Sequence, residues 1–449
     1  MKKLFLAILA VITFTSVSAQ EPRWEYLFNG RNLDGWTTTG GEAEFRVENS
    51  TIIGAAVRGT PNTFLITERE FGDFILEFEF KVSDGLNSGV QFRSHDNIPE
   101  YNRGRVHGYQ FEIDPTERAW TGGIFDEGRR GWLYKLTFNQ KGRTAFRHNA
   151  WNTGRIEAIG HSIRGWVNGI PTADLIDDMT ASGFIGLQVH SINRDDQEGT
   201  TAQFRSIRIM TEDLERFRTP QTNDIVQRNA IPNTISEREA AEGWTLLWDG
   251  KTTAGWRGVN SESFPAQGWK IEDGALKIVA SGEGESTEGR DIVTTRTFRN
   301  FMLQVDFRIT ERAHSGIRYF VNPAKKGGAC ASVGCEWRIV DERRLRDLPE
   351  NRSMGSLFDL IAPSADRKTI RWAEFNTAKI VVRGDHVEHW LNGVKLFDYQ
   401  RNTYMWRALV EASEYHHCRN FGNLDIGLIL LRNVGDEVWF RNIKIKELP

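Results

Sequence analysis

The chain has 449 residues, a length that allows two large domains, each with a substantial hydrophobic core. Its formal net charge is −3, with lysine and arginine scattered among the acidic residues, so it lacks the basic surface that nucleic-acid binding requires. We therefore expect no nucleic-acid partner.

The first nineteen residues have the pattern of a secretory signal peptide. Lys2 and Lys3 precede an apolar run, and Val17 and Ala19 supply small residues before a cleavage site at Gln20. The apolar run is too short to span a bilayer comfortably, and no cysteine follows it to accept a lipid. We expect residues 1–19 to be removed and the protein to be secreted or periplasmic, without a membrane anchor.

The rest of the chain carries one series of motifs twice. The repeated pairs are YLFNGRNLDGW (26–36) and LLWDGKTTAGW (246–256), SGVQFR (88–93) and SGIRYF (315–320), GWVNG (165–169) and HWLNG (389–393), and FRSIRI (204–209) and FRNIKI (440–445). The copies lie more than 200 residues apart, whereas solenoid and propeller repeats run about 20–50 residues. We expect tandem domains at 20–212 and 244–449, joined by a linker at 213–243.

The expected secondary structure is almost wholly β. In FILEFEFKV (74–82) apolar residues alternate with charged ones, and FMLQVDFRI (301–309) repeats the pattern, which is typical of strands with one buried face. We predict an all-β fold of packed antiparallel sheets. In the linker, Ser236 and Glu239 form a capping box before a short helix.

Three segments of the first domain place polar side chains on one face of a predicted strand. These are Gln91, Arg93 and His95 in VQFRSH, Gln110, Glu112 and Asp114 in GYQFEID, and Gln188 and His190 in GLQVH. Together they form a candidate cleft wall. The alternative is that they are the solvent-facing side of a sheet.

The loop TGGIFDEGRRGWL gathers charged residues beside Trp132. Asp126, Arg129 and Trp132 are candidate substrate-binding residues, with the indole as a platform for a sugar ring. The alternative is a turn whose charges are solvated.

These motifs, from LFNG through NSGVQFRS, GYQFEID and GLQVH to FRSIRI, resemble the bacterial 3-keto-disaccharide hydrolase family, also described as 3-keto-glucoside 1,2-lyase/2-hydroxyglucal hydratase. Both halves of the chain match. The resemblance implies two tandem concanavalin-like lectin/glucanase jelly-roll sandwiches. It also implies a secreted enzyme acting on glycosides already oxidised at C3 by a separate oxidoreductase.

Such a reaction needs a base for the C2 hydrogen, donors for the enolate oxygen and an acid for the leaving group. Glu112 and His190 are the expected base or acid, Arg93 is the expected charged donor, and Asp114 completes the catalytic group. Gln91, Gln110 and Gln188 are expected to bind substrate. A divalent metal held by His190, Glu112 and Asp114 is a further option.

The second domain departs from the family pattern. Arg338 and Arg432 stand where glutamines are typical, and Val434 stands where a histidine is typical. The remaining candidates are Arg318, Glu336 and Asp341, with His416 and His417 as substitutes from a loop. We interpret this domain as a degenerate copy, with roles in glycan binding or packing left open.

Two alternatives to a 3-keto-glycoside lyase/hydratase stay open. One is a conventional glycosidase acting on unoxidised glycan, and the other is a non-catalytic carbohydrate-binding protein. The three cysteines all lie in the second half, where Cys330 and Cys335 are placed to close a small loop and leave Cys418 unpaired.

Overall fold

A computed structural model describes residues 21–449 except residue 138 and the stretches 282–289, 323–329, 331–332, 344–346, 365–369 and 419–420. The predicted signal peptide at 1–19 lies outside the described residues. The chain divides into two compact units between Ala230 and Ile231. Within the described ranges, no helix has the length and hydrophobicity needed to span a membrane.

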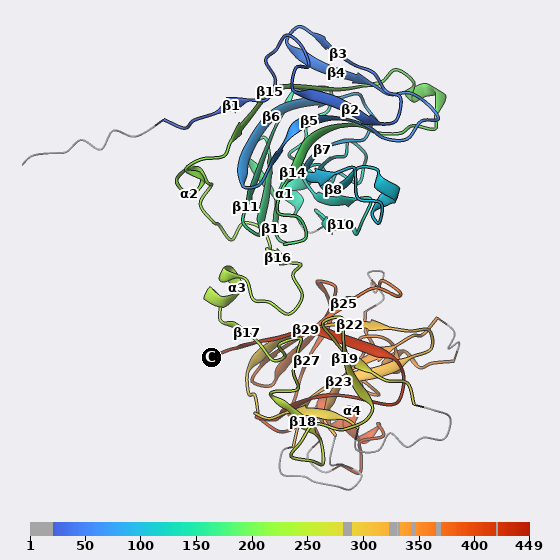
Figure 1. Ribbon diagram of the computed structural model, residues 1–449. Coiled ribbons are helices and arrows are strands. Elements are labelled where there is room, and N and C mark those ends of the chain that lie inside the picture. Colours follow the sequence, from blue (N-terminus) through green and yellow to red (C-terminus); the bar gives the residue numbers. More distant parts are fainter. Residues whose placement is uncertain are drawn as a thin grey trace, which may run out of the picture. The chain divides into compact units, whose positions relative to one another are not determined.

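The first unit is a sandwich of two sheets, whose described parts have nine and seven strands (Figure 1). The nine-stranded sheet contains β16 (Arg228–Asn229), β13 (Ile170–Ile176), β12 (Ser162–Val167), β11 (Asn152–Ile159), β6 (Phe74–Val82), β15 (Thr201–Met210), β4 (Thr51–Ala55) and β3 (Phe45–Glu48), with β1 (Glu25–Tyr26) beside β15. The seven-stranded sheet runs in the order β10 (Gly131–Tyr134), β9 (Ile124–Glu127), β8 (His107–Ile113), β7 (Ser88–His95), β14 (Gly183–Val189), β5 (Thr63–Phe71) and β2 (Trp36–Gly40).

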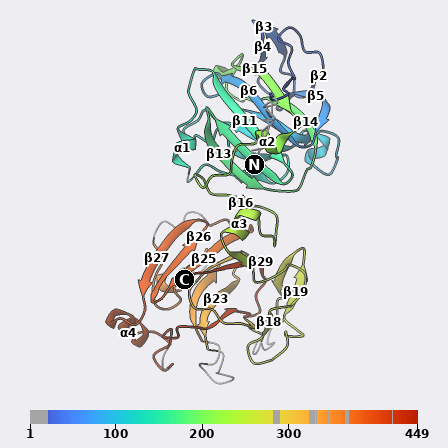
Figure 2. The ribbon, with the colours of Figure 1, turned by 90° about the vertical axis from the view of Figure 1, so that its left-hand side faces the viewer.

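The second unit repeats the architecture with a smaller second sheet (Figure 2). Its larger sheet contains β19 (Trp269–Glu272), β20 (Ala275–Ile278), β29 (Val438–Glu447), β22 (Phe301–Ile309), β25 (Asn376–Arg383), β26 (His386–Leu391) and β27 (Val394–Gln400), with β17 (Trp244–Leu246) beside β29. Its other sheet runs in the order β18 (Trp256–Gly258), β21 (Ile292–Thr294), β28 (Leu428–Leu431), β23 (His314–Val321) and β24 (Cys335–Val340). The predicted all-β class and the pair of tandem sandwiches are confirmed.

The cores follow the alternation read from the sequence. Along β6, Phe74, Leu76, Phe78 and Phe80 are buried in the core of the first unit, while the glutamates between them point away. The same pattern in β22 supplies the core of the second unit. Burial of these aromatic and aliphatic faces between two sheets is the main stabilising contribution.

Short helices and turns connect the strands. They are α1 (Gln140–Arg143), α2 (Leu214–Phe217), α3 (Glu237–Ala241) and α4 (Tyr404–Glu411), with 3₁₀ turns at Asn102–Gly104, Asp195–Gln197 and Glu350–Arg352. The predicted capping box is present at α3, where Ser236 accepts from the Glu239 backbone and Glu239 accepts from that of Ser236. The segment before Ala230 belongs to the first unit, because β16 pairs with β13.

Residues at matching positions of the repeated motifs make the same contacts in both units. The indole of Trp36 donates to the carbonyl of Leu27 at 2.7 Å, and Trp256 donates to Leu247 at 2.8 Å. Asn168 and Asn392 occupy hairpin turns with φ of 50° and 48°, each followed by a glycine with positive φ, as type I′ turns require.

The disulfide differs from the pairing suggested by sequence proximity. Cys330 is bonded to Cys418, 88 residues away, and Cys335 is a free thiol buried in the core. The expectation of a Cys330–Cys335 loop was wrong, because Cys335 begins β24 and points into the sandwich.

Candidate active site

Three neighbouring strands of the seven-stranded sheet place polar side chains on the face opposite the core, which we call the outer face. On β7 and β8, Gln91 pairs with Gln110 and Gly89 pairs with Glu112. Their alternating neighbours, such as Val90 and Phe111, lie in the core. A Cβ atom at Gly89 would lie 2.4 Å from the Gln110 side chain, so a glycine there leaves the amide its place. The predicted polar face is therefore present.

A directed chain of hydrogen bonds crosses this face and ends on a carboxylate. Gln91 Nε2 donates to Gln110 Oε1 at 2.7 Å, and Gln110 Nε2 donates to Glu112 Oε2 at 2.8 Å. Asn87 Nδ2 donates to the other oxygen of Glu112 at 2.7 Å. Burial raises the pKa of Glu112, and the two amide donors partly offset that rise by stabilising the ionised form. Each amide is held by the next, so the carboxylate is fixed in orientation.

Gln188 on β14 extends the face with an amide that has no partner. Its side chain is fully buried, and among the described residues neither its oxygen nor its nitrogen has a hydrogen-bond partner. Buried amides are nearly always satisfied, and leaving one unpaired costs free energy. The amide is therefore suited to a ligand that offers both a donor and an acceptor, as a sugar hydroxyl or ketone and its neighbour do.

A pocket of about 240 Å³ lies at the edge of the outer face, lined by Gly40, Pro61, Asn62, Phe64, Arg105, Val106, Glu127 and Ser191. Glu127 on β9 pairs with Gly108 of β8, which places it on the side of Gln110 and Glu112. Burial, followed by the negative charge of Glu112, raises the pKa of Glu127 to about 7. This carboxyl group can therefore give or take a proton near neutral pH.

Glu127 was not among the residues assigned a role from the sequence. The signal that identifies it is the alternation within IFDE, where Phe125 and Glu127 share one face and Ile124 and Asp126 share the other. The pKa change depends on Glu112 of the neighbouring strand, and single-strand patterns do not reveal it.

His190 follows β14 and precedes the pocket residue Ser191. Its Nδ1 lies 2.7 Å from the carbonyl oxygen of Ser191, a pocket residue whose backbone N–H donates to Asn62 Oδ1 at 2.8 Å. Because a carbonyl only accepts, Nδ1 carries the proton and Nε2 is the basic nitrogen of the neutral ring. The ring is half-buried.

An aromatic cluster borders Glu112 on the side of β9 and β10, at the opposite side of β8 from β7 and β14. Trp132 packs edge-on against Trp120 and Phe125, with ring centroids 4.7 and 5.3 Å apart. The guanidinium of Arg118 lies 4.9 Å from the Trp132 ring and reaches 3.6 Å from Glu112. Trp132 remains partly exposed, as a sugar platform must be.

Arg93 does not join this surface. A register shift between Phe92 and His95 breaks the alternation, and Arg93 itself adopts a φ of 45°. Its buried guanidinium donates to the carbonyls of Gly72, Gly160 and Ala158 and to Asp73. The prediction that Arg93 is a donor in the cleft was wrong, because the bulge turns it towards the other sheet, where it ties loops together.

Asp126 and Arg129 also face away from the pocket. Asp126 is fully buried and accepts from Arg129 Nε at 2.7 Å and Arg130 Nε at 2.6 Å. Arg130 in turn pairs with Asp177, which accepts from Tyr109. The substrate-binding role expected for Asp126 and Arg129 is not supported, because the Asp126 carboxylate and Arg129 Nε are engaged in this buried ion network and Arg129 Nη1 donates to Thr180.

Asp114 organises the turn after β8. Its carboxylate accepts from Thr116 Oγ1 at 2.6 Å and from Arg118 Nε at 2.7 Å. Asp114 therefore positions Arg118 beside Glu112. This is a supporting role, whereas the sequence analysis placed Asp114 in the catalytic group.

The metal-ligand set considered from the sequence does not converge. Among the described residues, the His, Cys, Asp and Glu side chains that gather closely enough to share an ion are Cys330, His417 and Cys418, and both cysteines are in the disulfide. His190, Glu112 and Asp114 do not form such a group.

The second unit carries different chemistry at the matching positions. In β23 and β24, Arg318 pairs with Glu336 and Gly316 pairs with Arg338, the register of Gln91 with Gln110 and Gly89 with Glu112. Leu431 pairs with Ile317 as Leu187 pairs with Val90, so Arg432 matches Gln188. Although burial opposes it, the charges of Arg318, Arg432 and Arg338 lower the pKa of Glu336 to about 2.

Glu336 and Arg318 are thus brought together as expected, whereas Asp341 is separate. Its carboxylate accepts from the Arg312 backbone at 2.8 Å and from Arg343 Nε at 2.8 Å, and so holds the loop after β24. His416 Nδ1 lies 3.0 Å from the carbonyl oxygen of Ser413.

The chain is similar to known proteins in both halves. It matches the family described as the 3-keto-alpha-glucoside-1,2-lyase-like domain at residues 23–210 and 243–446. It is 31% identical over 234 residues to a 3-keto-disaccharide hydrolase of Bacteroides thetaiotaomicron, covering 46% of this chain and 79% of that protein.

Two solved structures are also similar to this chain. A protein of Parabacteroides distasonis, provisionally described as a glycosyl hydrolase, is 28% identical with a TM-score of 0.43, covering 49% of this chain and 100% of that one. The carbohydrate-binding module CBM66 of Bacillus subtilis is 19% identical with a TM-score of 0.28, covering 39% and 95%.

Proposed function

Because the chain belongs to the 3-keto-alpha-glucoside-1,2-lyase-like domain family, we propose that its first unit cleaves 3-keto-glycosides by elimination and rehydration. The observation that carries this proposal is the outer face itself, where two carboxyl groups and a row of buried amides lie beside a pocket, with His190 next to the pocket residue Ser191. It offers proton-transfer groups and neutral hydrogen-bonding groups together.

The reaction begins at C2, where the C3 ketone acidifies the hydrogen. Glu112 takes this proton, and the electron pair moves onto the ketone oxygen as an enolate. The pair then returns to form the C1–C2 double bond, and the C1–O bond breaks with its electrons leaving on the aglycone oxygen. Amide donors hold Glu112 in a fixed orientation, so it meets the substrate without rearrangement.

Glu127 protonates the departing oxygen, and the basic Nε2 of His190 takes the proton of the water that adds afterwards. The pKa of Glu127 lies near 7, so a large fraction of the molecules carry its proton at neutral pH. The unpaired amide of Gln188 donates to the enolate oxygen, and its own oxygen accepts from a sugar hydroxyl. Water then adds its hydroxyl to C1 while a proton returns to C2, which completes a net hydrolysis.

The proposed reaction also implies where the enzyme acts and what supplies its substrate. The pattern of residues 1–19 supports action outside the cytoplasm, in the periplasm or medium. The need for a ketone at C3 means that a separate oxidoreductase acting on sugar hydroxyls supplies the substrate.

Hydrolysis in D₂O tests the mechanism. Elimination breaks the C2–H bond, so the product 3-keto-sugar should carry deuterium at C2, as mass spectrometry and proton NMR would show. Product held without enzyme for the same time controls for exchange in buffer. Incorporation equal to that control would contradict elimination and favour direct displacement at C1.

One observation favours a second candidate. Glu112 and Glu127 are two carboxyl groups on one face, both with raised pKa values, and a conventional glycosidase also uses a pair of carboxyl groups. That enzyme would cleave a glucoside and its 3-keto form alike. If the enzyme cleaves the 3-keto form and leaves the glucoside intact, the elimination mechanism is favoured. If it cleaves both forms, the conventional glycosidase is favoured.

A further inference from the structure

Three arginines crowd one carboxylate on the sheet face of the second unit that matches the outer face of the first. We call Arg318, Arg338 and Arg432 the arginine cluster. Arg318 Nε donates to Glu336 Oε2 at 2.8 Å, Arg338 lies 3.2 Å from Oε1, and Arg432 lies 3.4 Å from both oxygens. Arg318 and Arg338 are buried, and Arg432 keeps 26% of its side chain exposed at the opening of the cluster.

Arg338 and Arg432 have one carboxylate partner between them. Among the described residues, the carboxylate with which both pair is that of Glu336, which Arg318 also contacts. Asp291 accepts from the backbone N–H of Asn433 at 2.7 Å, and Asp436 pairs with His314 at 2.5 Å. A buried guanidinium without its own counter-charge is costly, so the site favours an added anion.

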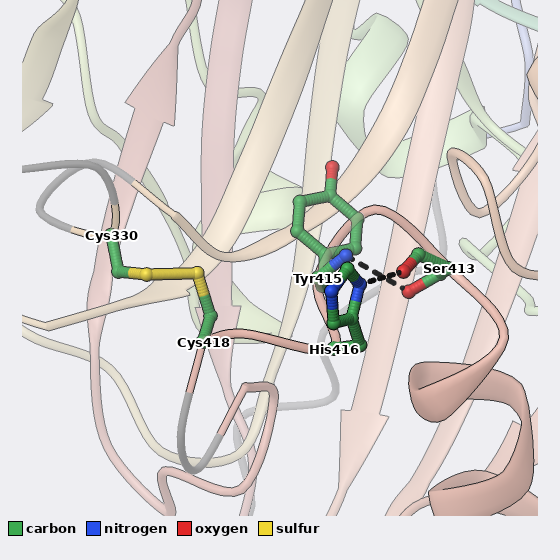
Figure 3. The surroundings of a disulfide bond; sticks show 5 residues. All are labelled: Cys330, Ser413, Tyr415, His416 and Cys418. Carbon is green, nitrogen blue, oxygen red and sulfur yellow. Dashed lines mark hydrogen bonds between the residues drawn. A yellow bond between two sulfur atoms is a disulfide. The ribbon is translucent and has the colours of Figure 1, made fainter.

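Two buried donors at the cluster, the Tyr415 hydroxyl and Arg338 Nε, have no hydrogen-bond partner among the described residues. Tyr415 is buried and acts electrostatically on Arg318 and Arg338. Tyr415 lies three residues before Cys418, which is bonded to Cys330 (Figure 3). Its ring stacks on Phe421 with ring centroids 4.1 Å apart.

We propose that the arginine cluster binds an anionic substituent of a sugar, a carboxylate as in uronic acids or a sulfate ester. Planar guanidinium groups match the oxygens of both anions, and the Tyr415 hydroxyl adds a further donor. Only the sugar part of this proposal rests on the proposed function. The second unit would then tether acidic glycan near an enzyme unit, instead of being a degenerate copy without a ligand.

Binding to the full chain at constant ionic strength tests the proposal. Isothermal titration would use methyl glucuronoside, glucose 6-sulfate, methyl glucoside, and sodium acetate and sulfate as free anions. We expect at least one of the two anionic sugars to bind, and the neutral glucoside to bind at least tenfold more weakly. The sugar that binds identifies the substituent. Free anions that compete as well as the sugars would overturn the sugar part.

Variants locate the site. Arg432→Gln should weaken the anionic sugar by about 10–100-fold, the range for losing a hydrogen bond to a charged group, and Tyr415→Phe by a smaller factor. Arg407→Gln, an equal charge change at an exposed position of α4, is the matched control. Unchanged affinity in Arg432→Gln and Tyr415→Phe would overturn the proposal. Turnover of a 3-keto-glucoside by Arg432→Gln should stay near the parent's, so the first unit's function is tested separately.

Discussion

The two units carry side chains of different charge at matching positions of equivalent strands. The positions of Gln91, Gln110, Glu112 and Gln188 in the first unit are those of Arg318, Glu336, Arg338 and Arg432 in the second. In the first unit burial raises the pKa values of Glu112 and Glu127, and neutral amide donors offset that rise only in part, whereas the arginines around Glu336 lower its pKa to about 2 although burial opposes them. A shared fold thus gives one face suited to proton transfer and another suited to holding an anion.

Loss of a proton-transfer group should have the largest effect. His190→Ala and Glu112→Gln should each slow 3-keto-glucoside cleavage by roughly 10²–10⁴, the range for a general acid or base. Val434 is the residue of the second unit that matches His190. Val434→Ala is therefore the matched control and should leave turnover within about twofold. Steady-state rates measure the difference, with circular dichroism to check folding.

If Val434→Ala is as slow as His190→Ala, both units take part in turnover and the comparison fails. Near-normal rates in both His190→Ala and Glu112→Gln would place the proton transfers elsewhere.

Arg93 should prove to be a structural residue. Arg93→Ala leaves three carbonyls and Asp73 without their donor, which should lower the free energy of unfolding of the first unit by about 2–4 kcal/mol. In the second unit the matching residue is Phe320, and Arg401 supplies a similar tether to the carbonyls of Gly384, Gly422 and Leu424. Arg401→Ala should therefore destabilise the second unit by a similar amount.

Hydrogen exchange resolved by peptide would assign each loss to its unit. The kcat of folded Arg93→Ala at low temperature should stay within about threefold of the parent's. A large fall in kcat with exchange unchanged would restore Arg93 to the catalytic group.

The smallest expected effect is a pH dependence of stability with opposite sign in the two units. The pKa of Glu127 in the folded state is about 7, above its usual 4.5, so the native state retains a proton that the unfolded chain has lost. Stability of the first unit should fall as pH rises from 4.5 to 7, by about 1–3 kcal/mol. Glu127→Gln should remove that fall.

Glu336 behaves in the reverse sense. Its pKa in the folded state is about 2, so its contribution is present above pH 4.5 and is lost as pH falls towards 2. Unfolding followed by peptide-resolved exchange between pH 4 and 8 would show the first trend, with the Glu127→Gln chain as control. A first unit whose stability is flat across that range would contradict the shifted pKa of Glu127.

The sequence by itself determined the local features. Alternation of period two predicted strands such as β6 and β22 and the shared face of Gln110 and Glu112, because side chains of a strand point to opposite sides in turn. Repeated motifs predicted two tandem domains.

Only the tertiary structure decided features that depend on pairing between distant segments. The bulge at Arg93 reversed its side, the ion network of Asp177 and Arg130 engaged Asp126, and Cys418 paired with Cys330 across 88 residues. The proton affinity of Glu127 depends first on its burial and then on the charge of Glu112 on a neighbouring strand. Register, bulges and burial are properties of the assembled sheet, so a single strand's pattern does not contain them.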